Sequence, residues 1–134
     1  MTELIICTTC RPLHHPPEQR ASGELLLEAV QAEQAFSGRS DWAAVRVRGV
    51  ACMAGCSHAC TAAFQAEGKH SYQFGDLHPQ ADTARQLLDC AVLHQQVTDG
   101  SLAREARPPL LRNGMLCRLP PILASVNGPA VGTP

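Results

Sequence analysis

Aromatic residues are scarce in this sequence, and long hydrophobic runs are absent. Phe, Trp and Tyr make up 4% of the 134 residues, so a core must be built mainly from Leu, Val, Ala and Ile. No stretch approaches the roughly 18 apolar residues needed to span a bilayer. The first residues, Met1–Ile6, lack the basic region and the apolar length of a signal peptide. We therefore expect a cytoplasmic protein with no membrane partner.

Several common functional patterns are also missing. There is no glycine-rich phosphate loop, no His-x-x-x-His zinc-enzyme motif and no Ser/His/Asp set that can be assembled from the sequence. The net charge is −1, and the chain lacks the face-wide basic excess that nucleic-acid-binding proteins normally carry. We therefore expect no nucleic acid partner, and the case for hydrolytic or transferase catalysis is weak.

Charge and proline divide the chain into two parts. Residues 1–100 hold seven Lys or Arg against eleven Asp or Glu, a balance of −4, whereas residues 101–134 hold four Arg and one Glu, a balance of +3. The second part also contains six of the ten prolines, which preclude long helices. We predict a compact domain over 1–100 and a Pro-rich basic arm over 101–134. Residues 101–123 of the arm should pack on the body or on a partner, and its end should be disordered.

Hydrophobic periodicity predicts one α/β domain. The predicted elements, in order, are a strand over 4–7, a helix over 22–37, a strand over 44–50, a hairpin over 61–74 that turns at Glu67-Gly68, and a helix over 82–97. In the first helix, the apolar stripe is predicted to comprise Leu25, Ala29, Ala32 and Phe36, widened by Leu26 and Val30. This order suits a central sheet with helices packed on it.

Five of the seven cysteines form two tight groups. Cys7 and Cys10 follow the first predicted strand, and Cys52, Cys56 and Cys60 follow the second. Thiolates gathered in this way are soft ligands, which suit zinc, copper(I) or iron–sulfur clusters. In a reducing compartment, disulfides are the less favoured use of such cysteines. If the two strands are neighbours, the loops at their ends converge and can wrap one metal centre.

The spacing of these cysteines resembles that of a known superfamily. Cys-x2-Cys followed by Cys-x3-Cys, with 41 residues between the pairs, is similar to the thioredoxin-like [2Fe-2S] ferredoxins and to the cluster-bearing subunit of respiratory complex I. The best local match is residues 49–58. Cys-Thr-Thr-Cys, Cys-x3-Cys-Ser-x2-Cys and Tyr72-x-Phe74-Gly75-Asp76-Leu77 resemble a narrower bacterial family of predicted metal-binding proteins, often encoded near cobalamin-biosynthesis genes. That resemblance covers residues 3–123.

The resemblance implies a fold and a function. The fold would be α/β and thioredoxin-like, with a four-stranded mixed sheet, two main helices and an extended C-terminal arm. The protein would be a small [2Fe-2S] one-electron carrier rather than an enzyme, with a redox partner protein or a metal-cofactor enzyme as its partner, and linked to cobalamin or cobalt metabolism. A homodimer is an open possibility. The implied ligands are Cys7, Cys10, Cys52 and Cys56, with Cys60 as the alternative to Cys10.

Two other functions remain open from the residues alone. The cysteines could hold a single zinc or other divalent metal such as cobalt, for metal handling or sensing. Alternatively, Cys7-x-x-Cys10 could act as a thiol–disulfide oxidoreductase, which leaves Cys52, Cys56 and Cys60 without a role. The sequence also departs from the ferredoxins, because its first cysteine pair is short and Cys60 stands where they usually carry a proline. Cys90 is expected in the core.

Overall fold

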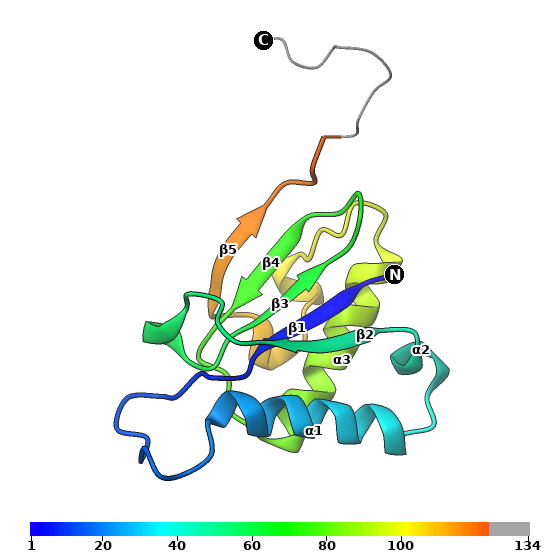
Figure 1. Cartoon of the computed structure of the whole chain (residues 1–134). Coiled ribbons are helices and arrows are strands. Elements are labelled where there is room, and N and C mark those ends of the chain that lie inside the picture. Colours follow the sequence, from blue (N-terminus) through cyan, green and yellow to red (C-terminus); the bar gives the residue numbers. More distant parts are fainter. Residues whose placement is uncertain (124–134) are drawn as a thin grey trace, which may run out of the picture.

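The computed structural model describes residues 1–123 of the chain, and Figure 1 shows the arrangement of its elements. The helices are α1 (Ser22–Phe36), α2 (Ser40–Ala43) and α3 (Ala81–Gln96), with short 3-10 turns η1 (Cys56–His58), η2 (Arg104–Ala106) and η3 (Pro109–Leu111). The strands are β1 (Glu3–Cys7), β2 (Arg46–Val50), β3 (Ala62–Gln65), β4 (Ser71–Phe74) and β5 (Met115–Leu119). The disorder expected at the end of the arm concerns residues outside this range.

The strands form one mixed sheet in the order β2-β1-β3-β4-β5. β1 and β2 run parallel, and the pairs β1–β3, β3–β4 and β4–β5 are antiparallel. The hairpin turn falls where the sequence predicted it, with Gly68 at a φ of 75° and a hydrogen bond from Lys69 N–H to Ala66 O of 3.1 Å. The mixed α/β class is therefore confirmed.

The prediction of four strands is wrong, because the sheet has five. The additional strand, β5, comes from the arm and pairs with β4 so that Arg118 lies opposite Tyr72. The segment Met-Leu-Cys-Arg-Leu gives little period-2 signal, because an edge strand is paired on one side only and its side chains are half-buried or exposed. The proline pair that follows it, Pro120-Pro121, also suggested a loop rather than a strand.

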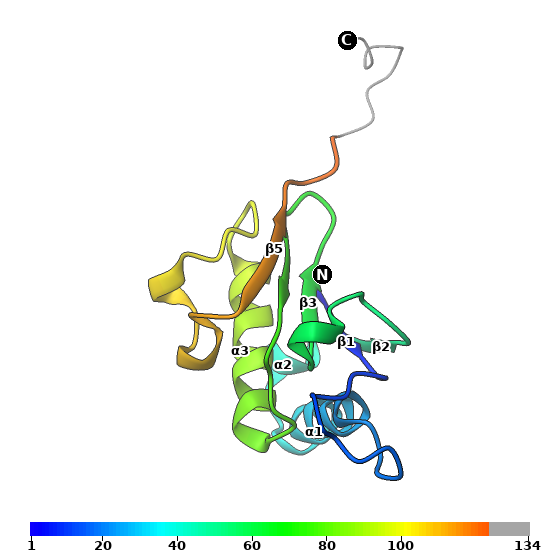
Figure 2. The same cartoon turned by 90° about the vertical axis from the view of Figure 1, so that its left-hand side faces the viewer.

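The core lies between the sheet and the helices α1 and α3, which pack against each other. Figure 2 shows α3 on one side of the strands, with η2 and η3 beside it. In α1, the buried apolar side chains are Leu26 and Val30, whereas Leu25 is 36% exposed and Phe36 is 89% exposed. The predicted stripe was therefore centred one position away from the face that α1 turns toward the sheet.

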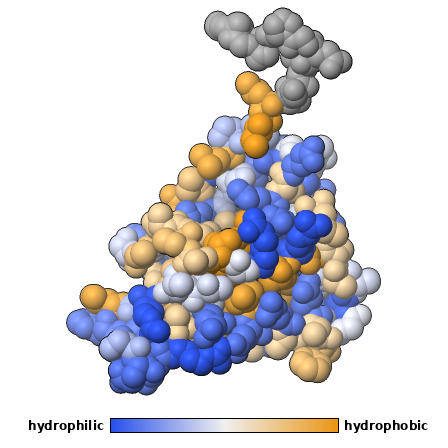
Figure 3. Space-filling view, viewed as in Figure 1, coloured by the Kyte–Doolittle hydropathy of each residue, from blue (hydrophilic) through white to orange (hydrophobic). Residues whose placement is uncertain are grey.

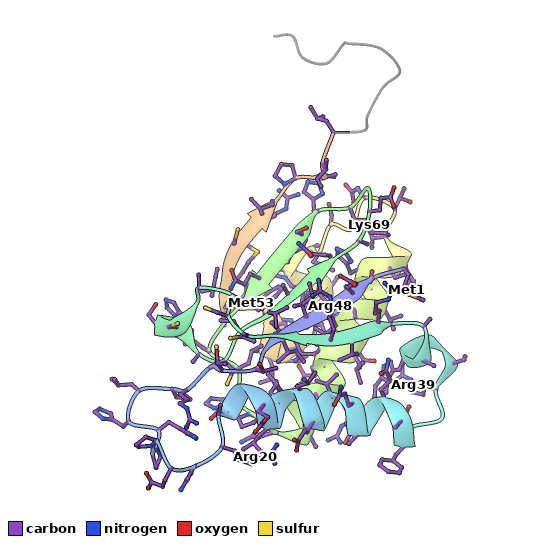
Figure 4. All side chains as sticks on the ribbon, viewed as in Figure 1. Met1, Arg20, Arg39, Arg48, Met53 and Lys69 are labelled. Carbon is purple, nitrogen blue, oxygen red and sulfur yellow. The ribbon has the colours of Figure 1, made fainter. Side chains whose placement is uncertain are left out.

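The other face of the sheet carries no helix among the residues that the structure describes (Figure 2). Figure 3 views this face and shows hydrophobic side chains beside strongly hydrophilic ones. Arg46 and Arg48 of β2 are exposed and form salt bridges with Glu3 of β1, at 3.7 and 3.2 Å. Figure 4 shows Arg48 over the middle of the strands.

The arm folds back onto the body of the protein. Leu102 and Leu111 are buried, and Leu102 N–H donates a 3.0 Å hydrogen bond to the hydroxyl of Tyr72 in β4. Residues 101–123 therefore contribute side chains to the same core as residues 1–100. Within the described range, none of the helices has the length and apolar character required to cross a bilayer.

Candidate functional site

The two cysteine groups lie at the same end of the sheet. β1 and β2 are parallel neighbours in which Cys7 lies opposite Val50, so the loops that follow both strands leave the sheet together (Figure 1). Hydrogen bonds join these loops: Thr8 N–H donates to Val50 O at 2.8 Å, and the Thr9 hydroxyl donates to Ala51 O. The convergence expected from the sequence is therefore present in the structure.

Cys60 lies at the same end of the sheet and is brought there by the segment that leads into β3. It stands just before β3, which is antiparallel to β1, and Cys7 N–H donates to Thr61 O at 3.2 Å. The backbone of Cys60 is held on its other side by two hydrogen bonds with Leu77, of 3.3 and 3.1 Å. The peptide bond between Ala59 and Cys60 is cis.

Cys7, Cys10 and Cys60 form a buried thiol trio. Their exposed fractions are 2%, 4% and 0%. The Sγ of Cys7 lies 3.9 Å from Ala51 O, and the Sγ of Cys10 lies 3.7 Å from the hydroxyl of Thr61. These contacts place hydroxyl groups and backbone polar atoms around the sulfurs, within an otherwise apolar environment.

The pKa values of the trio are shifted in different directions. Burial works against the Cys7 thiolate, but hydrogen bonding from the Cys10 thiol, Thr9 and the Met53 backbone N–H outweighs burial and lowers the pKa of Cys7. Burial, followed by the hydrogen bond shared with Cys7, raises the pKa of Cys10. Burial and the nearby charges of Cys10 and Cys7 raise the pKa of Cys60 to about 12. Cys7 is therefore the thiol of the trio that ionises most readily.

Cys52 and Cys56 lie outside the trio on loop 51–59, whose residues are exposed or partly exposed. Cys52 Sγ accepts a 3.3 Å hydrogen bond from Ala54 N–H, and Cys56 begins the turn η1. Figure 4 shows Met53 of this loop at the end of the sheet opposite Met1 and Lys69. The loop contacts Cys7 through its backbone, whereas Cys52 and Cys56 themselves are exposed.

The donor chemistry fits a soft metal ion or an iron–sulfur cluster, because three buried thiols affect one another's ionisation and two more lie on a loop in contact with Cys7. In the conformation described for residues 1–123, no three His, Cys, Asp or Glu side chains are close enough to hold a metal ion. For four of the five clustered thiols to hold one metal ion, loop 51–59 would have to bring Cys52 and Cys56 closer to the trio.

The first turn of α1 packs against the loop that carries Cys7 and Cys10. Gly23 N–H donates to Cys10 O at 3.1 Å, and a Cβ at Gly23 would lie 1.9 Å from Cys7 O. Ser22 hydrogen-bonds Cys60 and favours its thiolate, although burial dominates that pKa. Sequence reasoning did not identify Gly23 or Thr61 as site residues. The only available signal was a glycine at the second position of a predicted helix, where it has poor helix propensity.

Among the described residues, Cys90, Cys117 and the histidines form no hydrogen bond to the sulfur atoms of the trio. Cys90 is fully buried in α3, as expected, and burial raises its pKa to about 12. Cys117 is partly exposed in β5 and lines a cavity of about 190 Å³ on the open face of the sheet. His15 contacts Arg20 O at 2.8 Å, and His58 Nδ1 lies 3.1 Å from the Asp76 carboxylate.

These features define a mixed α/β protein with a cysteine-lined cluster of loops at one end of its sheet. Residues 4–121 match the model of a family described as Protein of unknown function (DUF1636), and the chain belongs to this family. Among solved structures, a thioredoxin-like [2Fe-2S] ferredoxin from Aquifex aeolicus is similar over 61% of this chain and 74% of that chain, with 16% identity and a TM-score of 0.45. No curated protein matches the chain.

Proposed function

We propose that this protein is a small, cytoplasmic, thioredoxin-like [2Fe-2S] protein that carries one electron at a time. The observation that carries the proposal is the meeting of both cysteine loops at one end of the sheet, with Cys7, Cys10 and Cys60 buried together. The proposed ligands are Cys7, Cys10, Cys52 and Cys56, with Cys60 as the alternative to Cys10. When bound, the cluster would supply a one-electron redox couple.

The residues around the thiols have defined tasks in this proposal. Hydrogen bonding from Met53 N–H and Thr9 stabilises negative charge on Cys7, and such bonds to a ligand sulfur raise the potential of a cluster. Burial of Cys10 and Cys60 excludes water from one side of the site. Loop 51–59 leaves the other side accessible, which suits transfer of an electron to a docked protein.

The partner in this proposal is a redox protein or a metal-cofactor enzyme. A link to cobalamin or cobalt metabolism rests on the resemblance of the cysteine motifs to the bacterial family of predicted metal-binding proteins. A single divalent metal, zinc or cobalt, is the alternative occupant, because four of the five clustered thiols would complete a tetrahedral site.

Thiol–disulfide exchange is the second candidate function, and one observation favours it. Cys7 and Cys10 form a Cys-x-x-Cys pair in which each side chain shifts the pKa of the other, as in proteins that use such a pair for thiol exchange. Oxidation by a partner disulfide would form one S–S bond in this protein and reduce the partner to two thiols. Cys60 would stay a thiol in that reaction.

Anaerobic purification followed by metal and sulfide analysis separates the candidates. Brown protein with equimolar iron and sulfide and visible absorption supports the cluster, whereas colourless protein with about one zinc or cobalt per chain supports the single metal. Metal-free protein with a reversible Cys7–Cys10 disulfide supports thiol exchange. Either of the last two results overturns the electron-carrier proposal.

Two single substitutions then identify the fourth ligand. Cys10→Ser and Cys60→Ser remove one thiol of the trio each, and Cys90→Ser is the matched control, because Cys90 is as buried as Cys60 but lies in α3. We expect one of the first two variants to lose the cluster and Cys90→Ser to keep it. Full cluster content with an unchanged spectrum in both Cys10→Ser and Cys60→Ser would contradict the ligand assignment.

A further inference from the structure

The arginines of the arm lack the acidic partners that the arginines between residues 20 and 85 have. Each arginine in residues 20–85 forms a salt bridge; these are Arg20, Arg39, Arg46, Arg48 and Arg85. None of the arm's arginines forms one with any residue in 1–123; these are Arg104, Arg107, Arg112 and Arg118. Residues 101–123 contain a single acid, Glu105, so the arm presents an uncompensated balance of +3.

Neutral acceptors hold the exposed guanidinium groups in place. Arg104 donates to the side-chain oxygen of Asn113 at 3.1 Å, and Arg112 Nε donates to Arg107 O at 3.1 Å. Arg118 Nε donates to the hydroxyl of Tyr72 at 3.0 Å. Because these acceptors carry no formal charge, the side chains are ordered while their positive charge stays available to a partner.

Arg107 adds a buried charge to this surface. It is 7% exposed, its guanidinium lies 5.6 Å from the centre of the Phe74 ring, and its Nη1 donates to Leu111 O at 2.9 Å. Its Nε has no hydrogen-bond partner among the described residues. A buried guanidinium without a carboxylate is costly, and its positive potential is weakly screened by solvent. A negative group nearby would offset that cost.

Apolar side chains stand among these charges. Leu110, between Arg107 and Arg112, is 47% exposed, and Met115, three residues beyond Arg112, is 43% exposed. Arginine and methionine together are enriched in protein–protein interfaces. This mixture fits an acidic protein segment with some apolar residues better than it fits an isolated small anion.

The arm and the cysteine loop both lie next to Gly75. Gly75 N–H donates to Gly114 O at 2.8 Å, and a Cβ at Gly75 would meet both His58 of η1 and Leu116 of β5. A protein seated on the arm would therefore lie beside the loop that carries Cys52 and Cys56.

We infer that Arg104, Arg107, Arg112 and Arg118, with Leu110 and Met115, form a docking surface for an acidic segment of a partner protein. Complementary charge would orient the partner beside the cysteine loop and speed its association. The inference does not depend on which metal or cluster the thiols hold, so it can fail while the proposed function stands.

The test measures binding of a fluorescein-labelled acidic peptide, built from glutamate and leucine, to the full chain by fluorescence anisotropy. The variant Arg104→Gln/Arg112→Gln removes two unpaired charges, and the control Arg46→Gln/Arg48→Gln removes two charges that are paired with Glu3. Both variants change the net charge equally. We expect the first to weaken binding about tenfold and the control to stay within about twofold of the unchanged protein.

Arg104→Lys/Arg112→Lys shows whether charge carries the effect, and we expect it to retain binding within about threefold. Circular dichroism of each variant checks that the fold is kept. Equal weakening in the two glutamine variants, or no binding by the unchanged protein, would overturn the inference. Displacement of the peptide by inorganic phosphate at low concentration would also overturn it, by assigning the surface to a small anion.

Discussion

His94 is a buried titratable side chain whose two ring nitrogens are both hydrogen-bonded. Nε2 lies 2.7 Å from His70 O, and Nδ1 lies 2.9 Å from the hydroxyl of Thr2. A carbonyl oxygen can only accept, so Nε2 carries the proton and Nδ1 accepts from Thr2. The neutral ring thus ties the start of the chain to α3 and to the hairpin.

Acid should destabilise the fold through His94. Burial lowers its pKa, and the positive charges of Lys69, His70 and the N-terminal amine act in the same direction. The unfolded chain binds more protons between the folded pKa and the ordinary value of 6.5. This stability is therefore fully present above the unfolded pKa and is lost as the pH falls through the folded pKa.

Urea unfolding at a series of pH values measures this effect. Below neutral pH, the free energy of unfolding should fall as the pH falls. We expect His94→Gln to reduce the slope of this free energy against pH by at most about 1.4 kcal/mol per pH unit, the value for one proton. His78→Gln is the control, because His78 is exposed and is not among the groups that shift the pKa of His94. A larger change of this slope in His78→Gln than in His94→Gln would contradict the assignment.

At the scale of elements, the position of α1 depends on Gly23. The missing side chain lets the first turn of the helix approach Cys7 O, where a Cβ would lie at 1.9 Å. Gly23→Ala should therefore push α1 away from the cysteine loop and cost about 1–3 kcal/mol of stability, despite the better helix propensity of alanine. Gln31→Ala, on the exposed side of the same helix, should stay within about 0.5 kcal/mol of the unchanged protein.

Thermal unfolding and metal content of both variants check this prediction. Gly23→Ala should lower the melting temperature and, under the proposed function, the metal content, since the displaced helix also distorts the loop between Cys7 and Cys10. A Gly23→Ala protein as stable as Gln31→Ala would show that α1 does not need this close approach.

Tyr72 fixes the arm to the sheet through one oxygen. Its hydroxyl accepts from Leu102 N–H and from Arg118 Nε, both at 3.0 Å. Tyr72→Phe leaves the buried Leu102 N–H without an acceptor and should cost about 1–3 kcal/mol. Hydrogen exchange at the Leu102 amide should become faster in the variant. Unchanged exchange there would mean that packing alone holds the arm.

The long elements were predictable because their patterns are local. The α3 prediction, 82–97, differs from Ala81–Gln96 by one residue at each end, since its apolar stripe is continuous. The fifth strand escaped prediction because its partner, β4, lies 40 residues or more away in the chain and no local periodicity marks it. In α1, the orientation was misread because leucine at three successive positions, 25–27, leaves the buried face undetermined by sequence.

The thiols show the same division between local and tertiary information. The sequence predicted that the cysteine loops meet if the first two strands are neighbours, and β1 and β2 are parallel neighbours in the structure. The burial of Cys60 beside Cys7 could not be predicted from the sequence, because it depends on the antiparallel pairing of β3 with β1 and on the hydrogen bonds to Leu77. Cys56 and Cys60, which are consecutive cysteines in the sequence, therefore lie in different environments.

At the scale of the whole molecule, the arm is part of the core. Leu111 of η3 is completely buried, whereas its neighbour Leu110 is 47% exposed. Leu111→Ala should cost about 2–5 kcal/mol, and Leu110→Ala should change stability by less than about 0.5 kcal/mol. Unfolding followed by circular dichroism and by Trp42 fluorescence should give coincident transitions, because the arm and the body share one core.

Separate transitions in Leu111→Ala would instead define the arm as a unit that unfolds alone. Equal effects of the two leucine substitutions would contradict the burial difference directly. Both outcomes bear on the predicted division at residue 100, which treats the arm as distinct from the domain over 1–100.

The parallel pairing of β1 and β2 has an evolutionary consequence. The chain between them leaves and re-enters the sheet at fixed points. Residues can therefore be inserted or lost at the connection between α1 and α2, residues 37–39, without disturbing the packing of Gly23 against Cys7 or moving either cysteine loop. The interval of 41 residues between Cys10 and Cys52 is therefore free to drift among descendants of a common ancestor. Genome searches for such proteins should weigh the residues flanking each cysteine group and leave the distance between the groups unconstrained.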